Sequence, residues 1–175
     1  MARADRGRSL TIGTYQASFT VPNLNREEVR LPTSSVVLSS QRVAMDDAIF
    51  TVQQKNPVLA ANPLVYEGQK LVPSVTRVFS QARDLYVFLQ AYEREAASTR
   101  PLVAFAAFYQ GDTKVFESTP VSVTDGIDAR SKAVPIRFSI PLQSVPPGRY
   151  ECQITVLDPE AQKTAYWRVP IAVVP

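Results

Sequence analysis

Apolar and polar residues alternate with a period of two along most of this chain, and that pattern constrains the fold more than any other feature. Tyr150, Cys152 and Ile154 fall on one side of such a segment, and polar residues stand between them. The same alternation recurs over residues 14–21 and 134–140. Because successive side chains of a strand point to opposite faces, these segments are predicted to be half-buried strands.

Turn signals divide the second half of the chain into regular lengths. Gly111, Gly126 and the run Pro146-Pro147-Gly148 mark bends between apolar segments. Residues 102–109 are apolar on both faces, which favours an interior strand. The seven predicted strands lie near residues 71–80, 84–93, 101–110, 113–119, 132–142, 148–157 and 163–174. The predicted fold is therefore all-β, an antiparallel immunoglobulin-like sandwich with an N-terminal β-hairpin extension.

One local motif supports a sandwich of that type. Pro146, Pro147 and Gly148 stand directly before the penultimate strand, and Tyr150 follows them. This arrangement resembles the tyrosine corner of immunoglobulin and fibronectin type III domains, in which the hydroxyl bonds to upstream backbone. Cys152 lies on the same face, and we expect a buried thiol there.

The domain organisation follows from these segments and from one internal repeat. Residues 13–21 match residues 148–156 at four of nine positions. Residues 13–40 are therefore predicted to form a β-hairpin that resembles the closing strands of a preceding sandwich. Residues 1–12 are expected to be a disordered or artificially added start, residues 41–69 a connecting segment with one strand near 49–53, and residues 70–175 the sandwich.

Composition excludes several classes of function. The chain has no histidine and one cysteine, so His-based catalysis, an intrachain disulfide and Cys-cluster metal sites are ruled out. The net charge is +3 without a basic stripe, which argues against nucleic-acid binding. No apolar stretch approaches the roughly 20 residues of a membrane span.

Acidic and hydroxyl residues give no catalytic pattern either. Asp46-Asp47 and Glu27-Glu28 are neighbours whose side chains point apart, and Asp125 and Asp128 lack the ligand set of a calcium loop. Ser34-Ser35 and Ser39-Ser40 have no accompanying histidine or nucleophile elbow. We expect no enzyme, cofactor or metal, and a carboxylate-based hydrolase is the remaining catalytic alternative.

Aromatic and apolar residues supply the candidate contact surfaces. Tyr166 and Trp167 are adjacent on one strand and must face opposite sides, so one of them is a candidate for an exposed ligand or partner surface. Tyr15, Phe19 and Val21 share one face of the predicted hairpin. An isolated hairpin is marginally stable in water, so we expect it to pair either with its own sandwich or with a second copy.

Several runs carry a family resemblance. Residues 21–24, 34–40, 71–79, 85–88 and 146–150 resemble the C-terminal region of the acidobacterial von Willebrand factor A-related proteins. The resemblance implies an extracytoplasmic location, secreted or in the cell envelope, and an N-terminal factor-A domain with an Asp-x-Ser-x-Ser metal site. The chain lacks that motif, so no metal ligand carries over.

These observations lead to two expectations for function. The first is a non-catalytic interaction or structural module of a larger secreted or envelope protein, which contacts a protein partner or associates with itself through the N-terminal hairpin. The alternative is a carbohydrate-binding β-sandwich that uses exposed aromatic side chains.

Overall fold

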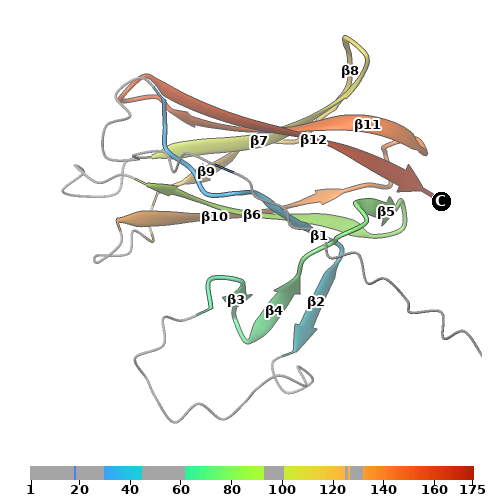
Figure 1. Cartoon of the computed structure of the whole chain (residues 1–175), viewed down its shortest axis with the longest axis horizontal. Helices are drawn as coiled ribbons and strands as arrows, with labels where there is room; N and C mark the ends of the chain where they lie inside the picture. The colour runs from blue at the N-terminus through green and yellow to red at the C-terminus, as the bar shows by residue number, and fades with distance from the viewer. Residues whose placement is uncertain (1–17, 19–29, 45–61, 93–100, 125, 127–131) are drawn as a thin grey trace, which may run out of the picture.

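A computed structural model describes residues 18, 30–44, 62–92, 101–124, 126 and 132–175. All regular secondary structure in these residues is β-strand, and no helix occurs among them. Two sheets lie face to face, and a smaller third sheet projects below them in Figure 1. The predicted all-β, sandwich-like character is confirmed.

The first of the two facing sheets, called the large sheet, has the strand order β5-β12-β11-β7-β8, and β9 also pairs with β7. Its strands are β5 (Val78–Ser80), β7 (Leu102–Gln110), β8 (Thr113–Glu117), β9 (Val121–Val123), β11 (Gly148–Asp158) and β12 (Lys163–Val174). All pairings in it are antiparallel except that of β5 with β12, which is parallel. β7 is an interior strand, as its two apolar faces predicted.

The opposing small sheet has the order β1-β6-β10 and is entirely antiparallel. Its strands are β1 (Val37–Ser39), β6 (Asp84–Tyr92) and β10 (Ala133–Pro141). The core fills the space between the two sheets, and it contains Leu85 and Leu89 of β6, Ile136 of β10, and Cys152 and Ile154 of β11. The alternation in the sequence therefore identified the inward faces of these strands correctly.

The tyrosine corner is present. The Tyr150 hydroxyl donates to the carbonyl oxygen of Pro146 at 2.6 Å, and the side chain is 4% exposed. Gly148 lies against this ring: a Cβ at that position would stand 3.3 Å from the Tyr150 Oη and 3.2 Å from the Gln110 Nε2. The Pro-Pro-Gly run thus supplies both the bend and the room that the tyrosine needs.

The segment predicted as one strand over residues 71–80 forms two strands in different sheets. β4 (Gln69–Val72) belongs to the third sheet and β5 to the large sheet. Pro73 interrupts the alternation because it has no N–H for a ladder. The Arg77 amide then donates to the Ser74 Oγ at 3.1 Å, which closes a turn between the two strands.

The third sheet, called the insertion sheet, has the order β2-β4-β3 and lies between β1 and β5 in the chain. β2 (Gln41–Ala44) and β3 (Val65–Tyr66) fall in the predicted connecting segment. Glu67 and Gly68 join β3 to β4 with φ values of 50° and 71°, the conformation of a two-residue hairpin turn. The strand expected near residues 49–53 lies outside the described residues.

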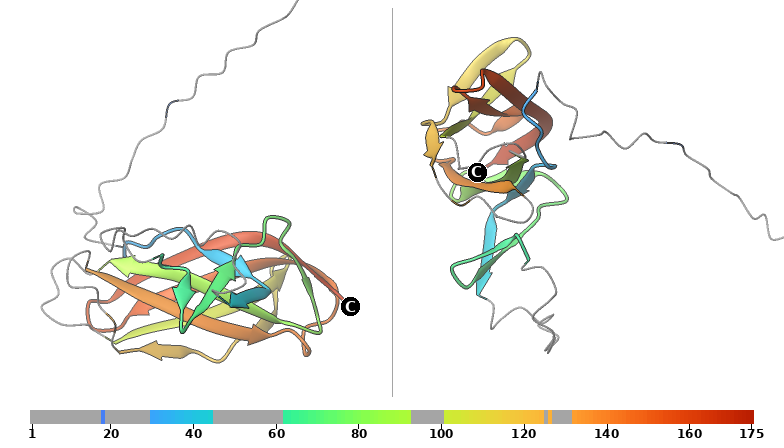
Figure 2. Two further views of the ribbon diagram at one scale, coloured as in Figure 1. Left: turned by 90° about the horizontal axis from the view of Figure 1, so that it is seen from below. Right: turned by 90° about the vertical axis from the view of Figure 1, so that its left-hand side faces the viewer.

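The two-sheet body extends towards the N-terminus beyond the predicted boundary at residue 70. β1 pairs with β6, and Leu31 and Leu38 are each 4% exposed in the core. Arg30 forms a parallel bridge with Thr164, so residues 30–39 cross from the large sheet to the small one (Figure 2). The second arm of the predicted hairpin therefore belongs to this body. The first arm, except for Ser18, lies outside the described residues.

Candidate functional site

The outer face of the large sheet is the candidate contact surface, because it carries the exposed aromatic residue that the sequence predicted. Register places three rows of side chains across β12, β11 and β7: Tyr166–Thr155–Phe105, Arg168–Gln153–Ala107 and Pro170–Glu151–Tyr109. The polar residues predicted on the outer face of β11 are thus flanked by aromatic residues from both neighbouring strands.

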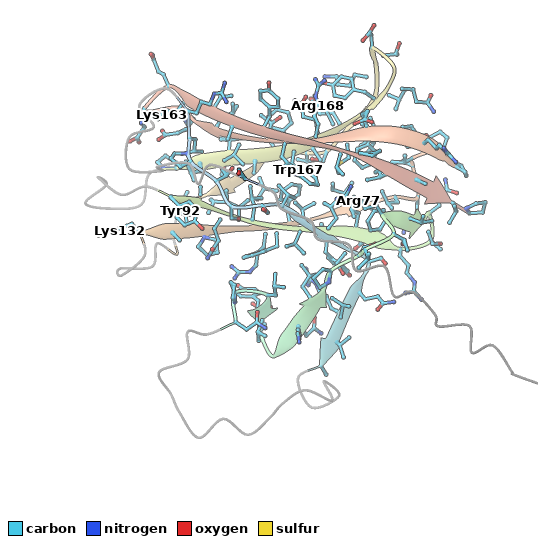
Figure 3. All side chains as sticks on the ribbon, viewed as in Figure 1. Arg77, Tyr92, Lys132, Lys163, Trp167 and Arg168 are labelled. Atoms are coloured by element: carbon cyan, nitrogen blue, oxygen red, sulfur yellow. The ribbon has the colours of Figure 1, made fainter. Side chains whose placement is uncertain are left out.

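Tyr166 and Trp167 lie on opposite sides of β12, as period-two alternation requires. Tyr166 is 68% exposed, whereas Trp167 is half-buried and packs against the core. Figure 3 shows the Trp167 side chain between the two sheets and Arg168 on the outer side. Of these two predicted candidates, Tyr166 is therefore the one whose side chain is accessible to a ligand or partner.

Hydrogen bonds fix the polar side chains of this face. Arg168 Nε donates to Gln153 Oε1 at 2.6 Å, and Gln153 Nε2 donates to Thr155 Oγ1 at 3.0 Å. The Arg168 guanidinium also lies 5.4 Å from the centre of the Tyr109 ring, a cation–π distance. A surface whose side chains are already ordered loses less conformational entropy when a partner binds.

An open hollow of about 520 Å³ adjoins this face at the Tyr109 end. Its lining includes Arg77, Tyr109, Arg149 and Glu151. The hollow extends the polar and aromatic surface beyond the flat part of the sheet.

Phe105, Tyr109 and Arg168 were not identified as site residues from the sequence. Each follows the alternation of its own strand, but the side-by-side placement of β7, β11 and β12 depends on pairing between segments far apart in the chain. The sequence did indicate that Phe105 and Tyr109 share a face, because their positions on one strand differ by an even number.

One hydroxyl group of each serine pair has a structural partner. Ser39 Oγ accepts from the Gln41 amide at 2.9 Å and donates to the Val72 carbonyl, so it joins β1 to the insertion sheet. Ser34 Oγ accepts from the Gln90 amide at 2.9 Å. Both hydroxyl groups therefore stabilise the backbone through hydrogen bonds.

Cys152 is fully buried, as predicted, and burial raises the pKa of its thiol to about 12. A thiol is nucleophilic only as the thiolate, so the Cys152 thiol is unreactive near neutral pH. Within the described ranges, no three His, Cys, Asp or Glu side chains gather closely enough to hold a metal ion.

Other candidates from the sequence lie outside the part of the chain that the structure describes: Tyr15, Phe19 and Val21 of the first hairpin arm, and the acidic residues Glu27, Glu28, Asp46, Asp47, Asp125 and Asp128. Among the described residues, no helix is long and apolar enough to span a bilayer. Neither the protein-family models nor the curated proteins compared with this chain give a match.

Proposed function

We propose that the two-sheet body is an immunoglobulin-like sandwich. Strand order supports this assignment: β1-β6-β10 would correspond to strands A, B and E, and β12-β11-β7 to strands G, F and C. The tyrosine corner before β11 is a second support, because β11 would then be strand F. The insertion sheet is an addition to that plan.

We further propose that the chain is a non-catalytic interaction module of a larger secreted or envelope protein. The exposed Tyr166, standing in an ordered row with Thr155 and Phe105, is the observation that carries this proposal. Interfaces are enriched in tyrosine and arginine, and the outer face presents both. The extracytoplasmic location rests on the family resemblance.

A photo-crosslinking amino acid placed at position 166 tests the proposal in the producing cell. We expect a discrete covalent adduct from position 166 and none from position 72, where Val72 is exposed on β4 of the insertion sheet. Adducts of equal yield from both positions, or none from position 166, would argue against the outer face as the contact.

Carbohydrate binding is the second candidate, favoured by the exposed ring of Tyr166 beside hydrogen-bonding side chains. Trp167 lies on the opposite side of β12 from that ring, so calorimetry is the better readout of this surface. Calorimetric titration with cellohexaose and chitohexaose should give a binding heat with the wild type and none with Tyr166→Ala. Identical titration curves for the two proteins would rule out a sugar at Tyr166.

Self-association through the first hairpin arm is part of the same proposal. β1 is an edge strand of the small sheet in the described residues, so the first arm, with Tyr15, Phe19 and Val21, can return to its own sandwich or pair with a second copy. We propose the second copy. Light scattering should give a dimer mass for the full chain and a monomer mass after removal of residues 1–29. An unchanged mass would show that this arm is not the contact.

A further inference from the structure

Side chains of the insertion sheet and of the outer face of the small sheet line a narrow crevice. Figure 1 shows the insertion sheet below the small sheet. Its volume is about 40 Å³, which exceeds the roughly 10–15 Å³ needed to hold one water molecule. Arg42, Tyr66 and Leu71 line it from the insertion sheet, and Tyr86, Phe88 and Arg137 line it from the small sheet.

Two guanidinium groups in this crevice are stacked on aromatic rings. Arg42 Cζ lies 4.0 Å from the centre of the Tyr86 ring. Arg137 Cζ lies 4.8 Å from the Tyr66 ring and 5.0 Å from the Phe88 ring. A stacked guanidinium keeps its N–H groups in the plane of the fork, where they remain available to an acceptor.

The two arginines outnumber the carboxylate of Glu67 in the lining of the crevice. Among the described residues, Lys114 and Glu117 form an ion pair, whereas Arg42 and Arg137 form none. Arg137 Nη2 donates to the Pro63 carbonyl at 3.1 Å, and this is a neutral partner. Desolvation lowers the pKa of Arg137, so the site holds a partly desolvated cation that forms no ion pair among the described residues.

Both guanidinium groups line the same crevice. Tyr86 and Phe88 are two residues apart on β6, so their rings lie on the same face at a spacing of about 7 Å. An oxyanion between the two arginines would receive charge-assisted hydrogen bonds from both sides.

The size of the space limits what can enter. A volume of about 40 Å³ admits a carboxyl group and little more. An open groove of about 660 Å³ adjoins the crevice and shares Arg42, Gln69 and Tyr86 with it. Strand β2 borders this groove and is an edge strand of the insertion sheet in the described residues, so its backbone can pair with an extended chain.

We propose that this crevice and groove bind an extended acidic segment of a partner polypeptide, with one Asp or Glu carboxylate between Arg42 and Arg137. The proposal rests on the function of the chain as an interaction module, but it uses a surface separate from Tyr166. Glu67 also lines the crevice and opposes the incoming charge.

Fluorescence anisotropy with a defined probe tests this site. The probe is a labelled, acetylated and amidated peptide of about eight residues in which Glu and Thr alternate, a length typical of strand addition. A matched peptide carries Gln in place of each Glu. We expect the Glu peptide to bind at least about tenfold more tightly than the Gln peptide, since two charge-assisted bonds depend on the carboxylate.

Variants of the crevice should act according to their charge and shape. Arg42→Gln should weaken binding of the Glu peptide by about tenfold or more, and Glu67→Gln should strengthen it. Arg137→Lys keeps the charge but loses the planar fork, so it should also weaken binding. Arg42→Gln is the main variant, because Arg137 also holds Pro63 and its loss could displace the insertion sheet.

Controls separate this site from general attraction and from the proposed function. Arg149→Gln removes an exposed arginine on β11, and Tyr166→Ala alters the other surface; both should bind the peptide as the wild type does. Equal binding of the Glu and Gln peptides, equal losses in Arg42→Gln and Arg149→Gln, or no binding would overturn the proposal. Glutarate that binds as tightly as the peptide would show a small-anion site instead. Crosslinking at position 166 does not depend on these outcomes.

Discussion

Replacing Tyr150 by phenylalanine isolates the contribution of the tyrosine corner to stability. The change removes the hydroxyl that donates to Pro146 at 2.6 Å and leaves the buried ring in place. A hydrogen bond of this kind contributes a net ~1 kcal/mol. Pro146 is exposed, so its carbonyl can turn to water and the penalty for an unpaired acceptor stays small. We expect a loss of about 1–1.5 kcal/mol.

Urea unfolding followed by circular dichroism measures this loss. With a slope of about 2–3 kcal/mol/M, the midpoint should fall by about 0.5 M at an unchanged slope. Tyr166→Phe is the matched control, because it removes a hydroxyl from a side chain that is 68% exposed, and its midpoint should not move. The reasoning fails if Tyr150→Phe shifts the midpoint no more than this control, since the corner would then not stabilise the fold.

Three further predictions concern the same body. Gly148→Ala brings a methyl group to 3.3 Å from the Tyr150 Oη, so it should lower the free energy of unfolding by about 1 kcal/mol. The double variant with Tyr150→Phe should lose less free energy of unfolding than the sum of the two single losses. Relative to a chain shortened by residues 1–29, removal of residues 1–40 also deletes the buried Leu31 and Leu38 and should lower the free energy of unfolding by about 3–6 kcal/mol; equal urea midpoints for the two shortened chains would contradict the placement of β1. Because burial raises the Cys152 pKa to about 12 from 9.0, titration of this thiol should not change stability with pH below pH 9 and should lower stability as the pH rises from 9 towards 12, a contribution that Cys152→Ala removes. Rapid labelling of the native thiol at pH 8 would refute its burial.

The sequence predicted strands wherever one segment carried its own signal. β10, β11 and β12 alternate over nine or more residues, so their extent and inward faces could be predicted from one strand at a time. The strands that were not predicted are short: β2 has four residues, β9 three and β3 two. So few residues cannot display a period, and such strands form because a neighbour offers backbone partners.

Pro73 indicated locally that residues 71–80 would be interrupted. Nothing in the local sequence indicated which sheet each half would join. A proline interrupts a ladder without indicating which sheet takes each half. β4 joins β2 and β3, while β5 joins β12, nearly a hundred residues further along the chain.

The sequence by itself determined the all-β class, the inward faces of the long strands, the tyrosine corner and the buried thiol, because each depends on residues within one strand or turn. Only the tertiary structure determined which side chains come together on the two candidate binding surfaces. The row from Tyr166 to Phe105 exists because β12, β11 and β7 pair in one register. The crevice brings Arg42 and Arg137 together because the insertion sheet folds against β6 and β10. Pairing between distant segments determines which side chains meet across strands, and the alternation within one strand does not predict that pairing.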